Sequence, residues 1–148
     1  MEKVFLDTNI LLDVLFEREG YQSSLEILQM GDEGKLCLCT SVLSMANIAY
    51  LLRKSFSYGS LVATLAQLTS LVQVLPMDGD QFIEALFLNG PDLEDVLQIV
   101  CAMKNGCSAL ITHNSRDFKI TSGLMGEVTI PPVMTPEEAV TFYTGEAR

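Results

Sequence analysis

Residues 3–9 read KVFLDTN, a short apolar run that ends at an acidic residue. The run from Lys3 to Leu6 predicts a strand, and the polar residues from Asp7 to Asn9 end it. From Ile10 to Glu17 the apolar residues recur at the spacing of a helix. This first stretch therefore predicts a strand that passes through an acidic residue directly into a helix.

The same alternation of strand and helix continues along the chain. Further strands are predicted at Leu36–Thr40, Val72–Leu75, Ala109–Thr112 and Val128–Ile130. Further helices are predicted at Ser23–Met30, Ser41–Lys54, Tyr58–Leu71, Gln81–Leu88, Asp92–Lys104 and Pro136–Tyr143, and the first of these is expected to stop at Gly31 and Gly34. The alternation implies an α/β fold, a mostly parallel twisted sheet of four to five strands with helices on both faces.

The length and composition favour one folded unit. The chain has 148 residues, well below the roughly 250–300 at which single cores divide, so we expect one domain over residues 1–148. Hydrophobic residues make up 49% and charged residues 19%, which is enough apolar surface for a packed core. No apolar run approaches the ~20 residues of a membrane span, and the first residues lack the pattern of a signal peptide. We therefore expect a soluble, cytoplasmic protein with no membrane contact.

Acidic side chains outnumber basic ones by 19 to 9, which gives a formal net charge of −10. This charge argues against binding nucleic acid through phosphate neutralisation alone. It remains compatible with nucleic-acid chemistry, because a metal ion held by carboxylates brings its own positive charge to the phosphate. Asp13, Glu17, Glu19 and Glu26 are expected on solvent-exposed helix faces.

The cysteines and the single histidine give weak signals. Cys37 and Cys39 fall on one face of a predicted strand, and their spacing differs from the Cys-x2-Cys pattern of zinc sites. We expect them, with Cys101 and Cys107, to be core thiols, the alternative being a metal or disulfide site. His113 has no partner motif, which argues against catalytic triads and histidine-based metal sites.

Acidic and amide residues follow two of the predicted strands and open one helix. Asp7 follows the first strand, Asn114 and Asp117 follow the strand Ala109–Thr112, and Asp95 stands in the first turn of a helix. Functional residues of parallel sheets collect beyond the carboxyl ends of the strands. The sequence therefore places a candidate site at this edge of the sheet.

In this order, the three segments resemble the PIN domain, the nuclease fold of VapC-type toxins. The motifs are DTN at 7–9, EDVLQ at 94–98 and T-x-N-x-x-D-F at 112–118, and LSMAN at 43–47 resembles the third helix of the prokaryotic branch. The resemblance spans the chain from Val4 to about Thr135. It implies a three-layer PIN-like fold and an endoribonuclease that hydrolyses RNA phosphodiesters with Mg²⁺ or Mn²⁺. It also implies a toxin whose partners are RNA, an antitoxin protein and a second copy of the chain.

The resemblance also implies roles for individual residues. Asp7, Asp95 and Asp117 match acids of the family's catalytic, metal-binding pocket. Asn47 and Asn114 stand where the family has carboxylates, and each amide removes one negative charge from the metal site. An asparagine can still coordinate through its carbonyl oxygen or hydrogen-bond a metal-bound water. The auxiliary residues of the site are therefore Asn9, Asn47, Asn114 and Glu94.

Each of these residues also has a purely structural explanation. Asp7 can end its strand and cap the following helix, and Asp92 with Asp95 has the spacing of a capping box. Asp117 precedes Phe118 in a predicted loop, where aspartate often makes a turn. Asn47 lies on a mostly apolar helix and could be a hydrogen-bonded core amide. The alternative function is a degenerate PIN module that binds RNA or a protein partner without catalysis.

Two further groups of residues bear on partners. The clustered cations beside the predicted site, Arg53, Lys54, Arg116 and Lys119, either contact RNA phosphates or keep the surface soluble. The high apolar content is expected to leave an apolar patch beyond the core, formed with methionines 30, 45, 103, 125 and 134. Because closed two-fold dimers are the usual result of such a patch, we expect a homodimer.

Overall fold

The computed structural model describes residues 1–88, 90–126 and 129–145. Its centre is a five-stranded sheet in the order β3-β2-β1-β4-β5, with every neighbouring pair parallel. The strands are β1 (Lys3–Leu6), β2 (Cys37–Ser41), β3 (Gln73–Leu75), β4 (Ala109–Ile111) and β5 (Val133–Met134). This arrangement confirms the predicted parallel α/β fold.

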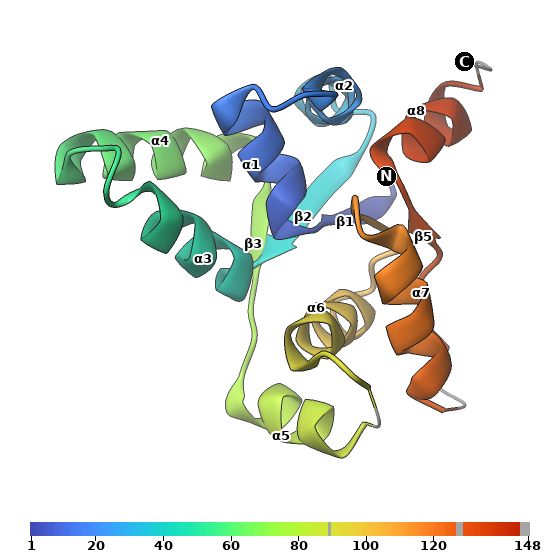
Figure 1. Ribbon diagram of the computed structural model, residues 1–148. Coiled ribbons are helices and arrows are strands. Elements are labelled where there is room, and N and C mark those ends of the chain that lie inside the picture. The colour runs from blue at the N-terminus through green and yellow to red at the C-terminus, as the bar shows by residue number, and fades with distance from the viewer. Residues whose placement is uncertain (89, 127–128, 146–148) are drawn as a thin grey trace.

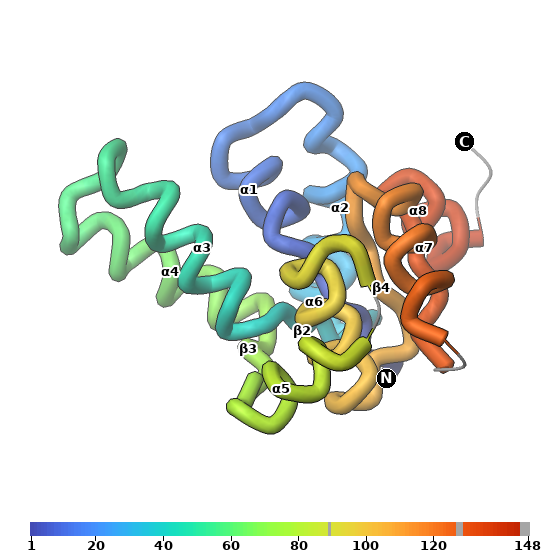
Figure 2. The backbone as a smooth tube through the Cα atoms, turned by 60° about the horizontal axis from the view of Figure 1, so that its bottom comes forward, coloured from blue at the N-terminus to red at the C-terminus, as the bar shows by residue number. Residues whose placement is uncertain are grey.

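Helices cover both faces of the sheet (Figure 1). They are α1 (Thr8–Phe16), α2 (Tyr21–Asp32), α3 (Val42–Leu52), α4 (Tyr58–Leu71), α5 (Gly79–Phe87), α6 (Leu93–Lys104), α7 (Ser115–Leu124) and α8 (Pro136–Thr144). One core joins the sheet to α1, α2, α3, α4 and α8, and a second core joins it to α5, α6 and α7. Figure 2 shows that α3 and α4 lie side by side and extend away from the sheet.

The central strands are apolar on both sides because both faces are covered. Val4 and Leu6 of β1 enter the first core, whereas Phe5 between them enters the second, and all three are fully buried. Strand β4 divides in the same way, with Leu110 in the second core. The unbroken apolar runs in the sequence are therefore those of buried parallel strands.

The parallel order determines where the polar residues after β1 and β4 lie. The backbone N–H of Asp7 donates to the carbonyl oxygen of Ile111 at 3.0 Å, which extends the pairing of β1 with β4 by one residue. Asp7 then caps α1, and Thr112 follows β4 at the same edge. The carboxyl ends of the two strands thus bring the first and third sequence motifs together.

The last strand was predicted at the wrong place. Strand β5 is Val133–Met134, after the two prolines, whereas residues 129 and 130 are not in a strand and Val128 lies outside the described residues. The prolines are tolerated at this edge of the sheet because a proline lacks an N–H but can still accept a hydrogen bond. The carbonyl oxygen of Pro132 accepts one from the N–H of Leu110 at 2.9 Å.

Helix α7 replaces the loop that was predicted around Asp117. Its composition is polar, but Phe118 is 1% exposed and Thr121 is also buried, so one face packs onto the second core. Tertiary packing of one face, rather than helix propensity, stabilises such a segment. Asp117 consequently lies in the first turn of a helix.

Helix α2 ends at Asp32, between the two glycines at which the sequence predicted a stop, and Gly34 has a left-handed backbone with φ of 75°. A Cβ at Gly31 would lie 2.4 Å from Cδ1 of Leu38. Gly31 therefore also permits the close approach of the helix to β2, where a larger residue would require Leu38 to shift.

The methionines and cysteines belong to the core. Met30 and Met125 are buried, and the other three methionines of the predicted patch are half-buried against the two cores, so they do not form a separate apolar patch. All four cysteines are free thiols, and three of them are buried, as expected of core thiols. Within the described residues, none of the helices is both long and apolar enough to cross a membrane.

Candidate active site

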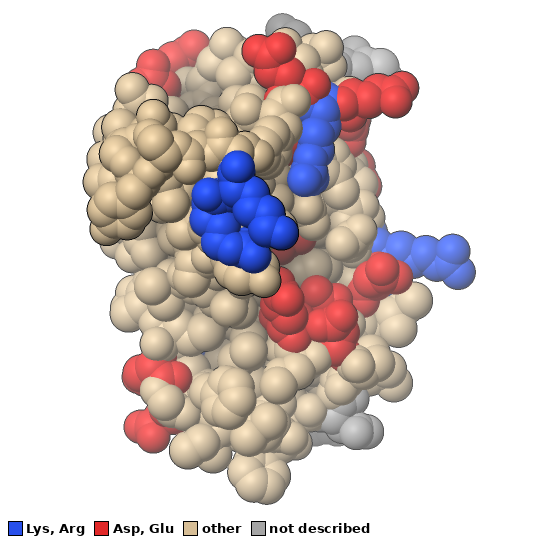
Figure 3. Space-filling view, turned by 60° about the vertical axis from the view of Figure 1, so that its left-hand side comes forward, with Lys and Arg blue, Asp and Glu red and all other residues tan. Residues whose placement is uncertain are grey.

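A cavity of about 400 Å³ opens at the carboxyl edge of the sheet. Its walls come from the start of α1, from α3, from the start of α6 and from the segment after β4; they are Asp7, Thr8, Asn9, Leu12, Asn47, Tyr50, Leu51, Asp92, Glu94, Asp95 and Asn114. Figure 3 shows a row of acidic side chains beside a hollow in the surface, with a group of basic side chains next to it. The first two acidic motifs of the sequence thus share one cavity.

Asp7 both caps a helix and lines this cavity. Its Oδ1 accepts a hydrogen bond from the N–H of Thr8 at 2.8 Å, and its Oδ2 accepts one from Oγ1 of Thr112 at 2.9 Å. The residue is only 6% exposed, and burial raises the pKa of its carboxyl above the ordinary value, although the two hydrogen bonds act in the opposite direction. The structural and functional explanations of Asp7 are therefore compatible.

The first turn of α6 supplies the other carboxylates. Asp92 caps the helix, because its Oδ1 accepts from the N–H of Asp95 at 3.1 Å. Burial, as the largest cause, and the negative charges of Asp92, Asp7, Glu94 and Asp117, in that order of size, together raise the pKa of the half-buried Asp95 to about 7. Asp95 is thus the point at which the negative charges of the site converge.

Asp117 is exposed and is not among the residues that line the cavity, but its charge reaches Asp95. Across residues 1–88, 90–126 and 129–145, no three Asp, Glu, His or Cys side chains are arranged to hold one ion together. A single ion bound by Asp7, Asp95 and Asp117 would therefore require these side chains to move closer. The metal-binding role of Asp117 stays a prediction.

The predicted auxiliary amides all line the cavity. Nδ2 of Asn47 donates to Oε1 of Glu94 at 3.1 Å, which links α3 to α6 across the site. Oδ1 of Asn9 accepts from Nη1 of Arg18 at 3.3 Å, and the backbone N–H of Asn114 donates to Thr112. Asn47 is therefore a half-buried cavity residue and not a core amide.

A family model described as PIN domain matches residues 3–116 of this chain. This chain belongs to the PIN domain family. Ribonuclease VapC1 of Aquifex aeolicus (strain VF5) is 30% identical to it over 123 residues, which cover 79% of this chain and 84% of that protein. These matches confirm the resemblance to the PIN domain family that was inferred from the sequence motifs.

Solved structures share the PIN fold at lower identity. The structure of VapBC-1 from nontypeable Haemophilus influenzae matches with a TM-score of 0.64 and 18% identity, over 90% of this chain and 98% of that chain. DNA-bound VapBC from Salmonella typhimurium matches with a TM-score of 0.65 and 20% identity, over 92% and 99% of the two chains. The mostly parallel sheet with its covering helices is thus the PIN architecture.

Behind the acidic cavity of this PIN domain lies a buried polar network that the sequence analysis did not assign. Nε2 of Gln98 donates to Oγ of Ser44 at 2.7 Å, and Oγ of Ser41 donates to Oε1 of Gln98 at 2.6 Å. Oγ1 of Thr8 donates to the same Ser44 oxygen at 2.8 Å. The network joins α6, α3 and α1, so it fixes the helices that carry the site. The signal in the sequence is a glutamine within the otherwise apolar run 96–102.

The predicted phosphate-binding cations lie on the surface. The guanidinium of Arg53 stacks 3.5 Å from the ring centre of Tyr50, a residue that lines the cavity, so this cation is adjacent to the site. Lys54, Arg116 and Lys119 are exposed. Contact of these four side chains with RNA stays a prediction.

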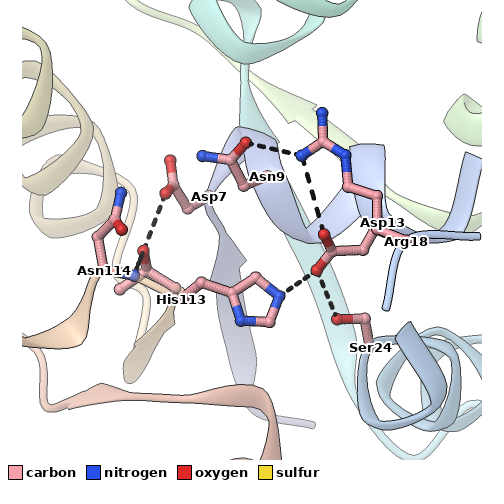
Figure 4. Close-up of polar contacts among 8 residues, drawn as sticks. Asp7, Asn9, Asp13, Arg18, Ser24, His113 and Asn114 are labelled. Atoms are coloured by element: carbon pink, nitrogen blue, oxygen red, sulfur yellow. Dashed lines mark hydrogen bonds and ion pairs between the residues drawn. The ribbon is translucent and has the colours of Figure 1, made fainter. Parts of the chain in front are cut away.

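Asp13 contradicts the prediction that it faces solvent. It is 5% exposed and accepts hydrogen bonds from Oγ of Ser24 at 3.2 Å and from the ring of His113, and Nη1 of Arg18 lies 3.9 Å from its Oδ1 (Figure 4). A carboxylate is buried in a protein only when such partners replace water. The helical spacing of residues 10–17 could not reveal partners that come from other segments.

Proposed function

We propose that this PIN domain protein is a metal-dependent endoribonuclease and the toxin of a toxin–antitoxin pair. The observation that carries the proposal is the convergence of carboxylates on one cavity, where burial and their negative charges together raise the pKa of Asp95 to about 7. The name of the relative from Aquifex aeolicus, a ribonuclease, supports the same activity.

The donor set fits a hard divalent cation. Carboxylate and amide oxygens are the ligands that Mg²⁺ and Mn²⁺ prefer, and the site offers them from several elements. Asp7, Asp95 and Asp117 would hold the ion, with Asn9, Asn47, Asn114 and Glu94 as auxiliary residues. Beside burial, the repulsion of neighbouring carboxylates contributes to the raised pKa of Asp95, and a bound cation would relieve this repulsion.

When bound, such an ion polarises a phosphoryl oxygen and activates a water for in-line attack on the phosphodiester. The residues of this chain prepare the site for it. Thr8 and Thr112 each donate to one oxygen of Asp7 and so orient its carboxylate. Asn47 restrains Glu94, which keeps that carboxylate at the cavity wall.

Substrate binding requires positive charge beside this acidic cavity. Arg53, Lys54, Arg116 and Lys119 are proposed to contact RNA phosphates, and Arg53 lies beside the site because it stacks on Tyr50, which lines the cavity. These contacts would offset the repulsion between the net charge of −10 and the RNA backbone.

The proposed partners are an antitoxin protein and a second copy of the chain, in the cytoplasm. Large apolar side chains remain exposed on α5, among them Phe82, Ile83, Leu86 and Phe87. Exposed apolar surface of this kind is typical of protein interfaces. Sedimentation of the isolated chain at tens of micromolar tests the homodimer, and a monomer would contradict it.

The direct test is calorimetric titration with Mn²⁺ and Mg²⁺, combined with cleavage of a mixed RNA pool, on wild type and Asp7→Asn. We expect wild type to bind metal and cleave RNA, and the variant to do neither. Metal-independent RNA binding without cleavage would instead favour the degenerate module, which the amides at positions 47 and 114 suggest. No metal binding and no cleavage would contradict the proposal.

A further inference from the structure

The segment between β4 and α7 carries three successive residues whose side chains divide between two sites. Oγ1 of Thr112 donates to Asp7, and Asn114 lines the acidic cavity. The side chain of His113 turns away from this cavity and contacts Oδ2 of Asp13 on α1 (Figure 4). This short segment is thus held from both sides by carboxylates of the β1–α1 unit.

Asp13 is a strong anchor because it is buried and contacts polar side chains from three segments of the chain. An ionised carboxylate only accepts hydrogen bonds, so Nε2 of His113 is the donor. The second donor, Ser24, comes from α2, and Arg18 follows α1. Asp13 therefore belongs to α1, is bonded to α2 through Ser24, and also contacts the segment that carries Thr112.

The contacts of Asp13 also lead back to the cavity. Nη1 of Arg18, which pairs with Asp13, donates to Oδ1 of Asn9 in the cavity wall. The contacts in Figure 4 run from Asn9, two residues after Asp7, through Arg18 and Asp13 to His113. The neighbour of His113 in the chain, Thr112, donates to Asp7. The contact of His113 with Asp13 thus acts together with the hydrogen bond from the N–H of Thr112 to the carbonyl oxygen of Met134 in holding the segment that donates to Asp7.

We propose that Asp13 and His113 are positioning residues, which hold the 112–114 segment so that Thr112 orients the Asp7 carboxylate and Asn114 faces the cavity. The proposal deepens the proposed function and rests on it for its effect on metal binding. The effect of His113 on the Asp7 carboxylate, through Thr112, can be tested without metal.

The metal-free test uses the backbone N–H of Thr8, which donates to Oδ1 of Asp7. Thr8 is the first residue of α1, so this N–H has no carbonyl partner within the helix, and its hydrogen exchange reports the position of the carboxylate. We expect exchange about three- to tenfold faster in His113→Phe than in wild type, because the variant fills the space without donating. Unchanged exchange at Thr8 in a folded His113→Phe protein would overturn the proposal.

Two further variants separate hydrogen bonding from general damage. His113→Gln retains a side-chain N–H donor and should keep the slow Thr8 exchange, and Glu19→Gln removes an exposed acid near Asp13 in the sequence and should change nothing. Thermal unfolding of each variant shows that it folds. Equal acceleration in His113→Gln and His113→Phe would overturn the role of the hydrogen bond.

Mn²⁺ titration of the same proteins then measures the consequence. Loss of a residue that orients a metal ligand costs about 10–100-fold in affinity, and we expect His113→Phe to fall in this range while His113→Gln stays near wild type. Affinity in His113→Phe within twofold of wild type would contradict the proposal. A wild-type chain that binds no metal would contradict the proposed function, and the exchange of Thr8 would still decide the positioning role.

Discussion

Two walls of the acidic cavity hold their carboxylates differently. On the Asp7 wall, formed by the end of β1 and the start of α1, the carboxylate is 6% exposed and both of its oxygens accept hydrogen bonds. On the Asp95 wall, formed by the first turn of α6, Glu94 is exposed and Asp95 is half-buried among like charges. Packing and hydrogen bonds thus hold the first carboxylate, whereas burial and the repulsion of neighbouring charges act together on the second.

The largest effect is expected from Asp7→Asn. Loss of a ligand costs more than loss of a residue that orients one, so Mn²⁺ affinity should fall by about 100-fold or more in calorimetric titration. The same change should raise the thermal stability of the metal-free protein at pH 7. The folded-state pKa of Asp7 lies above its unfolded value, so the ionised form destabilises the fold at any pH well above 4, and the neutral amide removes this cost.

Asp92→Asn is the matched control on the other wall. Asparagine caps helices as well as aspartate does, so the variant removes one charge and keeps the cap of α6. Its Mn²⁺ affinity should stay within a few-fold of wild type. If it loses as much as Asp7→Asn, the two walls do not differ in the way that we infer.

The second effect is a pH dependence that belongs to Asp95. Its folded-state pKa of about 7 lies above the ordinary value of 3.8, and the protonated acid cannot bind a cation. Mn²⁺ affinity should therefore fall about tenfold for each pH unit below 7. In the metal-free protein, stability should decrease as the pH rises from about 4 to 7, because the folded state binds the proton more tightly.

Calorimetry and thermal unfolding between pH 5 and 8 measure both slopes. Asp95→Asn should reduce the stability slope over this range, and the slope that survives is expected to come from Asp7, whose pKa is also raised by burial. A stability that rises with pH in the wild type, or a slope that is unchanged in Asp95→Asn, would show that another group is responsible.

A smaller effect is expected when charge is added to each wall. Asn47→Glu places a carboxylate on α3 against Glu94 of the Asp95 wall. Asn114→Asp adds one after β4 beside Thr112, which donates to Asp7 on the other wall. Each should raise Mg²⁺ affinity several-fold, about 1 kcal/mol, and Asn47→Glu should lower the metal-free unfolding temperature more. Mg²⁺ should gain more than Mn²⁺, because it gives up its water reluctantly. Unchanged metal affinity in both variants would show that the existing acids suffice.

The smallest effect is expected at Arg53, which lies outside both walls. Arg53→Gln should weaken RNA binding only a few-fold and reduce the salt dependence of binding by about one phosphate contact. Fluorescence anisotropy across a salt series measures this, with EDTA present to prevent cleavage. Lys35→Gln, which removes a cation paired with Glu33, is the control, and an equal loss there would assign the effect to net charge.

The residues of the Asp7 wall could be predicted because their signals are local. The apolar run of β1, the polar break after it and the helical spacing that follows all lie within 17 residues. The start of α6 was equally readable, since Asp92 and Asp95 have the spacing of a cap. Helix α7 could not be read in this way, because it depends on burial of Phe118 in a core that distant segments build.

The sequence by itself determined the parallel α/β fold, the PIN motifs and the acidic residues that follow β1 and open α6. Only the tertiary structure decided that Asp13 is buried, that Gly31 lies close to Leu38, that Gln98 links three helices and that Asp117 lies outside the cavity. The physical reason is the range of the interactions. Periodicity and capping act between residues a few positions apart, whereas His113 lies 100 residues from Asp13, Thr8 lies 90 from Gln98 and Leu38 lies 7 from Gly31.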